Sequence, residues 1–106
     1  MSQAINRMID WFESANKKFN LKNYREAIID YTKAIEQNQD YVEAYYGRGL
    51  AKYSIGELDS DWEEAIADYT KVIDLKPDHP EAYFSRGLIK LFQENYQYMD
   101  LLWEVY

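Results

Sequence analysis

The side chains that most often perform acid–base or nucleophilic chemistry are scarce in this sequence. His79 is the only histidine, it lies between Asp78 and Pro80, and there is no cysteine. A thiolate nucleophile, a Cys-ligated metal and a two-histidine metal motif are therefore excluded. No Ser-His-acid order and no phosphate-binding glycine loop accompany His79. We expect His79 to cap a helix or to be exposed, and we expect no catalytic residue, no metal, no cofactor and no enzyme activity.

Clustered carboxylates are the other group that could do chemistry, because hard cations such as Ca²⁺ bind oxygen ligands. The acidic segment 58–61 precedes Glu63 and Glu64. Neither a loop glycine nor a regular ligand spacing accompanies it, so a long solvated turn is the favoured interpretation. Ser60 and Glu63 stand at the spacing of a capping box, which predicts the start of a helix.

The charge balance indicates which partners suit the chain. It has 106 residues, with 12 Lys and Arg against 19 Asp and Glu, so the net charge is −7. Nucleic acids and anionic membranes both attract basic faces, so neither is an expected partner. Solubility explains most of the acid excess, with Asp and Glu at exposed helical positions, and a basic partner is mildly favoured. No transmembrane run or signal peptide is recognisable, so the expected location is the cytoplasm.

The sequence repeats itself at two offsets. Residues 26–33 match residues 64–71 at an offset of 38, whereas Trp11 aligns with Tyr45 at an offset of 34. A four-residue insertion within residues 57–61 reconciles the two offsets, so the basic period is 34 residues. A period of this length indicates stacked structural repeats.

Each repeat has the pattern of two helices. Apolar residues recur at i, i+3, i+4 and i+7, and strand alternation is absent. Asp40 and Asp78 stand where helix N-caps are expected. The pattern predicts six helices joined by short turns, at residues 4–20, 24–37, 41–55, 61–75, 80–93 and 96–105.

A signature of aromatic and small residues recurs in each unit. Its members are Trp11, Ala15, Ala27 and Tyr31, then Tyr45, Gly49, Ala65, Tyr69 and Pro77, then Tyr83 and Gly87. With the 34-residue period, this signature resembles the tetratricopeptide repeat (TPR) family. The resemblance implies an all-α fold, a short right-handed α-solenoid of about three units and six antiparallel helices. We expect one TPR domain over residues 1–106, with units at about 8–41, 42–79 and 80–106.

In the TPR family the first helices of successive units line a concave groove that binds peptides or helices. The resemblance implies a groove formed by Phe12, Asn16, Phe19, Tyr46, Leu50, Tyr53, Phe84, Leu88 and Leu91. Its rim is expected to be acidic, at Glu13, Glu43 and Glu81. Phe12, Tyr46 and Phe84 occupy equivalent places, so they either form an aromatic ladder across the groove or complete the packing between units. The predicted function is a non-catalytic protein–protein interaction scaffold for a partner with apolar anchors, favoured when basic.

Two departures from the family pattern narrow this expectation. Where the pattern has Leu, this sequence has Ser14, Arg48 and Arg86. The TPR variant that grips the acidic tails of chaperones requires two Lys, one Arg and two Asn in the groove. The matching places hold Phe12, Asn16, Gly47, Glu81 and Ser85. Only one Asn is kept and one place has the wrong charge, so binding of a chaperone tail is not expected.

The C-terminal segment offers a second surface. One stripe, at Tyr96, Met99, Trp103 and Tyr106, is expected to face the protein's own core. A second stripe, at Tyr98, Leu101, Leu102 and Val105, would normally meet a following unit. Three alternatives remain: a homodimer through this stripe, a chain that is a fragment of a longer array, and a last helix that exchanges with a neighbour. A homo-oligomerisation module is therefore the alternative function.

Overall fold

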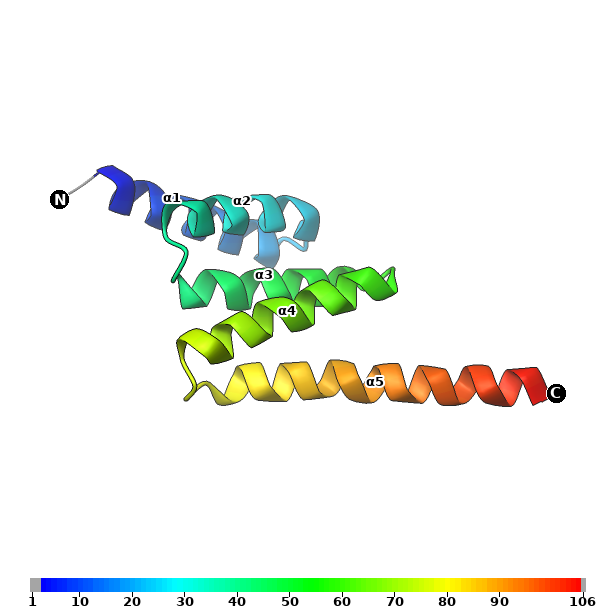
Figure 1. Cartoon of the computed structure of the whole chain (residues 1–106). Coiled ribbons are helices and arrows are strands. Elements are labelled where there is room, and N and C mark those ends of the chain that lie inside the picture. The colour runs from blue at the N-terminus through cyan, green and yellow to red at the C-terminus, as the bar shows by residue number, and fades with distance from the viewer. Residues whose placement is uncertain (1–2, 106) are drawn as a thin grey trace.

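The chain forms five α-helices within the described residues (Figure 1). The computed structural model describes residues 3–105, with side chains for residues 3–95. The helices are α1 (Gln3–Asn20), α2 (Tyr24–Gln37), α3 (Val42–Ile55), α4 (Asp59–Leu75) and α5 (Pro80–Val105). The predicted all-α repeat fold is confirmed, but the prediction of six helices is wrong.

α5 is one helix where the sequence pattern predicted two. The first helices of the first two units end at left-handed residues, Lys22 with φ 64° and Gly56 with φ 48°. Glu94 occupies the equivalent place in the third unit, and residues 93–95 contain neither glycine nor proline. Gln and Glu favour helical backbone, and the segment lacks a glycine such as Gly56 that favours a left-handed turn. The turn after α1, at Lys22, also has neither glycine nor proline, so the missing glycine alone does not separate the two cases. α5 continues through residues 96–105 without a turn.

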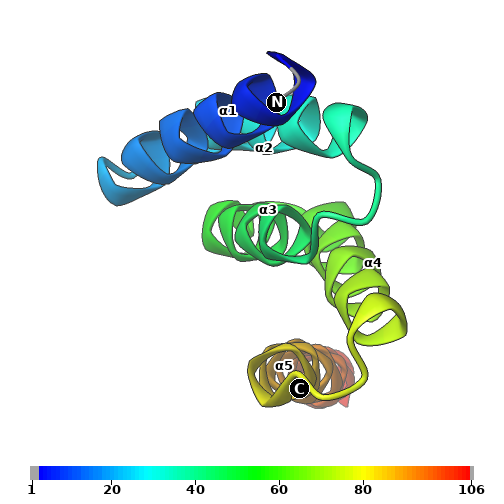
Figure 2. The same cartoon turned by 90° about the vertical axis from the view of Figure 1, so that its left-hand side faces the viewer.

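The helices stack in the order of the sequence. Each helix packs against the next one along the chain, and α1 also touches α3. Because short turns join them, consecutive helices are antiparallel, and the stack curves when viewed along the helices (Figure 2). The molecule is elongated, with extents of 63 × 29 × 18 Å. About two and a half helix-turn-helix units are stacked, namely α1–α2, α3–α4 and α5 alone.

Two glycines of α3, which have no Cβ, leave room for tyrosine rings in the core. A Cβ on Gly47 would lie 2.5 Å from the ring of Tyr31, and a Cβ on Gly49 would lie 2.7 Å from the ring of Tyr69. Both distances are far below van der Waals contact, so an alanine would displace either ring. Tyr31 is 2% exposed and Tyr69 is fully buried, and together they fill the spaces beside α3.

The predicted capping box at α4 is replaced by another capping arrangement. α4 begins two residues earlier than predicted, after Leu58. The Asp61 carboxylate accepts hydrogen bonds from the backbone N–H groups of Leu58 and Glu57 at 3.1 and 3.2 Å. Asp61 thus takes the role expected of Glu63, but it accepts from Glu57 and Leu58 rather than from Ser60, which lies inside the helix.

The residues that directly precede α3 and α5, Tyr41 and His79, lie one residue later than the predicted caps Asp40 and Asp78. Tyr41 precedes α3, and its side chain makes no capping hydrogen bond. At α5, His79 Nδ1 accepts a hydrogen bond from the backbone N–H of Ala82 at 3.1 Å. The only histidine therefore caps a helix, in agreement with one of the two expectations for it. Within the described residues, no helix has both the length and the apolarity needed to span a bilayer.

Candidate functional site

Two aspartates are buried between the helices of the first two units. Asp30 is 3% exposed and Asp68 is 4% exposed. Lys18 Nζ donates to Asp30 Oδ2 at 2.6 Å, and Ser14 Oγ donates to the same oxygen at 2.7 Å. A buried carboxylate needs such partners, because an unpaired buried charge is strongly destabilising. The expectation that acidic residues lie at exposed positions is wrong for these two.

Asp68 is paired with two cations. Arg48 donates to it in a bidentate manner, from Nη2 to Oδ1 at 2.7 Å and from Nε to Oδ2 at 2.9 Å. Lys52 Nζ lies 3.3 Å from Oδ2 of the same carboxylate. Burial by itself would lower the pKa of Arg48, but the hydrogen bonds and charge of Asp68 raise that pKa above its ordinary value. The guanidinium therefore stays charged inside the repeat.

The polar residues that replace the family's Leu also join successive units. Arg48 Nη1 donates to Thr32 Oγ1 at 3.2 Å, and Arg86 Nη1 donates to Thr70 Oγ1 at 3.3 Å. Each bond links the first helix of one unit to the second helix of the unit before it. Arg48 thus bonds to acceptors in its own unit and in the unit before it, whereas Arg86 bonds to Thr70 of the unit before it.

A cavity of about 290 Å³ opens between α1 and α3. Its lining residues are Phe12, Asn16, Phe19, Tyr31, Glu43, Tyr46, Gly47, Leu50 and His79. Five predicted groove residues and one predicted rim residue are among them. The volume lies at the lower end of the range of ligand pockets, which begins at roughly 300 Å³. A cavity of this size suits one or two side chains of a peptide.

Phe12 and Tyr46 make equivalent contacts in successive units. The ring centroid of Phe12 lies 4.9 Å from that of Tyr41, and the centroid of Tyr46 lies 5.1 Å from that of His79. Tyr41 and His79 each directly precede the first helix of the next unit. The two rings therefore line the cavity and also complete the packing between units.

Tyr31 and Asn16 form the polar pair of the cavity. Tyr31 Oη donates to Asn16 Oδ1 at 2.5 Å. Burial raises the pKa of Tyr31 to about 12, so the hydroxyl stays protonated at neutral pH. Because the bond uses the amide oxygen of Asn16, its NH₂ group is what remains to donate to a peptide carbonyl.

Three lining residues, Tyr31, Gly47 and His79, were not among the predicted groove or rim residues. Tyr31 comes from α2, and it reaches the cavity because Gly47 leaves room for its ring. His79 comes from the turn before α5. The repeat register carried a signal for His79, since it stands 38 residues after Tyr41 and takes the equivalent place.

Four predicted groove residues lie outside the cavity. Tyr53 packs against Trp62, with 6.5 Å between ring centroids. Phe84 and Leu91 are 68% and 51% exposed on α5, and Leu88 is half-buried. Phe84 is equivalent to Phe12 and Tyr46, but within the described residues no following unit covers it.

The predicted rim residues are all exposed, and two of them lie beside Tyr41. Burial raises the pKa of Tyr41, and the negative charges of Glu43 and Glu13 raise it further. Glu81 is the third, and its carboxylate lies 3.6 Å from Nδ1 of His79, which lines the cavity. The edge of the cavity next to α1 and α3 is therefore acidic.

The predicted self-association residues lie outside the part of the chain whose side chains the structure describes. They are Tyr98, Leu101, Leu102 and Val105, and only the helical backbone through them is described.

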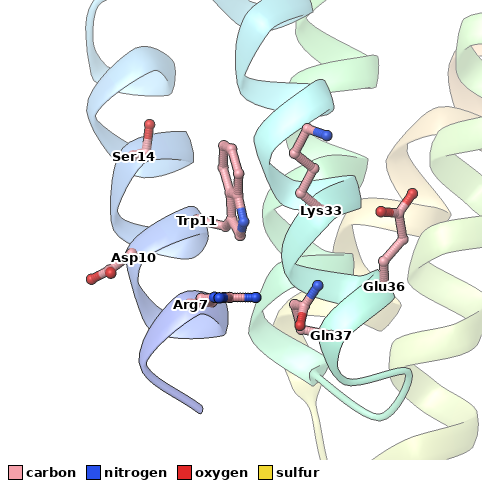
Figure 3. Close-up of a pocket in the computed structure, with 7 residues that line it drawn as sticks. All are labelled: Arg7, Asp10, Trp11, Ser14, Lys33, Glu36 and Gln37. Atoms are coloured by element: carbon pink, nitrogen blue, oxygen red, sulfur yellow. The ribbon is translucent and has the colours of Figure 1, made fainter. Parts of the chain in front are cut away.

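A larger hollow of about 600 Å³ lies between α1 and α2 (Figure 3). It is lined by Arg7, Asp10, Trp11, Ser14, Lys33, Glu36 and Gln37. Trp11 stands between the two helices with Lys33 Nζ 5.3 Å from its ring centroid, while Asp10 points away. Charges of both signs line this hollow and Trp11 is already in contact with a cation, so the cavity between α1 and α3 is the stronger candidate.

Among residues 3–95, no three His, Cys, Asp or Glu side chains are grouped so that they could hold a metal ion. In the acidic insertion, the Asp61 carboxylate is engaged with two backbone N–H groups. The insertion therefore acts as the start of α4.

The chain matches a known repeat family over most of its length. A family model described as TPR repeat matches residues 15–56 and 60–91. The gap between the two matches falls at the predicted insertion. No curated protein sequence matches the chain.

Solved structures share the fold. MamA is similar at 30% identity with a TM-score of 0.77, over 82% of this chain and 48% of MamA, so the chain spans about half the length of that protein. The first TPR of Spaghetti (RPAP3), solved with the HSP90 peptide SRMEEVD, is similar at 25% identity with a TM-score of 0.52. That alignment covers 84% of this chain and 94% of the RPAP3 domain.

Proposed function

Because the chain belongs to the tetratricopeptide repeat family, we propose that it is a non-catalytic scaffold that binds a segment of a partner protein between α1 and α3. The lining of the cavity carries the proposal. Phe19 and Leu50 supply apolar walls, and Asn16 supplies an amide that can bond to a peptide backbone. An apolar side chain of the partner fills the cavity, and binding releases water from these walls.

The proposed partner segment carries Lys or Arg beside its apolar anchors. No Lys or Arg lines the cavity, whereas Glu43 does, and Glu13 lies nearby. The net charge of −7 adds a long-range attraction for cations. The TPR of RPAP3 is solved with an acidic peptide, but the places that match the acidic-tail clamp supply no cation here. We therefore propose that this chain selects the opposite charge.

Synthetic peptides test the proposal. One probe is an amphipathic peptide with Leu at i, i+4 and i+7 and Lys at both flanks, and a second probe carries Glu in place of each Lys. We expect the Lys probe to shift the amide NMR signals of the cavity residues and to bind more tightly than the Glu probe. We expect SRMEEVD to leave these signals unchanged. Tighter binding of SRMEEVD than of the Lys probe would contradict the proposed charge preference.

Two variants separate binding from folding. Tyr46→Ala should weaken binding of the Lys probe by about 1–4 kcal/mol if this ring is an anchor. Phe84→Ala removes the equivalent ring outside the cavity and should leave binding unchanged. Because Tyr46 also packs between units, Glu43→Lys is a second test that changes only an exposed charge. If Tyr46→Ala and Phe84→Ala weaken binding of the Lys probe equally and Glu43→Lys has no effect, the cavity is not the binding site.

A further inference from the structure

α5 is a long helix with little of its surface covered. It has 26 residues, and α4 is its main packing partner. Its C-terminal part runs past the ends of the other helices (Figure 1). A Cβ on Gly87 would have no heavy atom within 4 Å, whereas a Cβ on the equivalent Gly49 would collide with Tyr69. Within the described residues, no other helix therefore covers the face of α5 at Gly87.

Two neighbouring stripes run along the described part of α5. Ile89 is fully buried and Phe92 contacts Trp62, with 6.2 Å between ring centroids, so this stripe faces the protein's own core. The other stripe contains Phe84 and Leu91, which are 68% and 51% exposed. The exposed stripe has large apolar side chains and no partner in the folded unit, which is typical of an interface.

The exposed stripe continues in the sequence along the whole helix. Its positions alternate by four and three residues, at Phe84, Leu88, Leu91, Asn95, Tyr98, Leu102 and Val105. This alternation is the heptad pattern of coiled-coil seams. All seven positions lie within the continuous helix, Pro80–Val105. The three described apolar positions and the three later ones thus belong to one seam, with Asn95 between them.

We propose that two copies of the chain pair through this seam as an antiparallel two-helix coiled coil. Antiparallel pairing sets Leu88 opposite Val105 of the second copy, and Leu91 opposite Leu102 of the second copy. Asn95 then lies opposite Tyr98 of the second copy, on both sides of the two-fold axis. Each of the six positions from Leu88 to Val105 then lies opposite an apolar or hydrogen-bonding residue, whereas Phe84 lies beyond the overlap of the two helices. Such self-complementarity is what a two-fold interface requires, and it selects a second copy as the occupant.

The polar seam position fits the antiparallel arrangement. An Asn at one seam position specifies the register of a coiled coil, and here it can bond to a tyrosine hydroxyl rather than to an apolar group. Antiparallel pairing also places the two folded bodies at opposite ends. Leu101, predicted with the self-association residues, falls outside the seam.

The molecular mass in solution tests the pairing. The chain has a mass of 12.7 kDa, and light scattering with size exclusion should give twice that value. Leu91→Asp and Leu102→Asp should each give the monomer mass with unchanged helical circular dichroism. Leu21→Asp is the control, because Leu21 is 72% exposed at the turn after α1, far from the seam. A monomeric wild type, including one in which residues 96–105 fold back onto their own α5, overturns the proposal.

Cross-linking tests the orientation, since the chain contains no cysteine. A mixture of Leu88→Cys and Val105→Cys chains should form a disulfide between copies on mild oxidation. Leu88→Cys alone should not, because antiparallel pairing separates the two thiols by about 26 Å along the helices. Efficient cross-linking of Leu88→Cys with itself would show parallel pairing and overturn the model. The pairing rests on α5 alone and not on the proposed peptide site, so either can fail without the other.

Discussion

At the scale of single residues, the buried aspartates decide how the first two units hold their helices together. Asp68 receives three contacts from Arg48 and Lys52, and both cations are largely buried, with 18% and 15% of their side chains exposed. Each charge is tolerated inside the protein only because the others are present. Arg48 stands where the TPR pattern has Leu, so at this place a buried ion pair replaces an apolar contact.

Asp68→Asn is expected to lower the free energy of unfolding by about 3–5 kcal/mol. The substitution keeps the size of the side chain but leaves Arg48 without its buried counter-charge, and Lys52 with only the exposed carboxylate of Glu64 at 4.0 Å. Urea unfolding followed by circular dichroism measures the effect, and the midpoint should fall while the slope stays the same.

An exposed ion pair supplies the control for this change. Arg25 and Glu57 lie 2.9 Å apart, but their side chains are 70% and 69% exposed. Glu57→Gln should change the unfolding free energy by less than about 1 kcal/mol. A loss in Glu57→Gln as large as that in Asp68→Asn would mean that net charge, rather than burial of the pair, accounts for the effect.

At the scale of helices, the sequence predicted where helices begin and end more easily than where one continues. The turns after α1 and α3 are marked by Lys22 and Gly56 in left-handed conformation. The corresponding segment of α5 has Glu94 at the place of Gly56, so it lacks the glycine that ends α3. The turn after α1, at Lys22, has neither glycine nor proline, so the repeat pattern could not distinguish a turn from a continued helix at this place.

The residues of the candidate site that lie on the first helices of the units could be predicted from the sequence. Phe12, Asn16 and Tyr46 follow from the repeat register alone. Tyr31 does not, because it reaches the cavity from the second helix, through a space that exists only where Gly47 faces α2. Contacts of this kind depend on how closely two helices approach, which the spacing of residues on one helix does not encode.

Two equivalent glycines are expected to respond oppositely to substitution by alanine. In Gly49→Ala the new Cβ would lie 2.7 Å from the Tyr69 ring, and the resulting shift should destabilise the protein by about 1–3 kcal/mol. In Gly87→Ala the Cβ meets nothing within 4 Å, so the higher helix propensity of alanine should stabilise the protein by about 0.5–1 kcal/mol. Thermal unfolding of the two variants measures both signs. Destabilisation by Gly87→Ala would mean that side-chain or backbone atoms approach Gly87 as closely as the Tyr69 ring approaches Gly49.

At the scale of the whole molecule, the stack behaves as a one-dimensional array. Each helix packs mainly on its neighbours in sequence, and the longest extent of the molecule is 63 Å. In such arrays stability is close to a sum of local terms, so one end can separate while the rest stays folded. α5 is the end that we expect to separate first, because only Ala82 and Ile89 are fully buried among its described side chains.

Ile89→Ala is therefore expected to release α5 before the rest of the molecule unfolds. Removing this buried side chain costs about 2–5 kcal/mol, all of it at the junction between α4 and α5. Hydrogen exchange with mass spectrometry should show lost protection in α5 and retained protection in α1 and α2. Val72→Ala is the comparison, because Val72 is fully buried in α4 and its loss should lower protection in α3, α4 and α5 together. If Ile89→Ala lowers protection equally in all five helices, the fold is one cooperative unit and the local description fails.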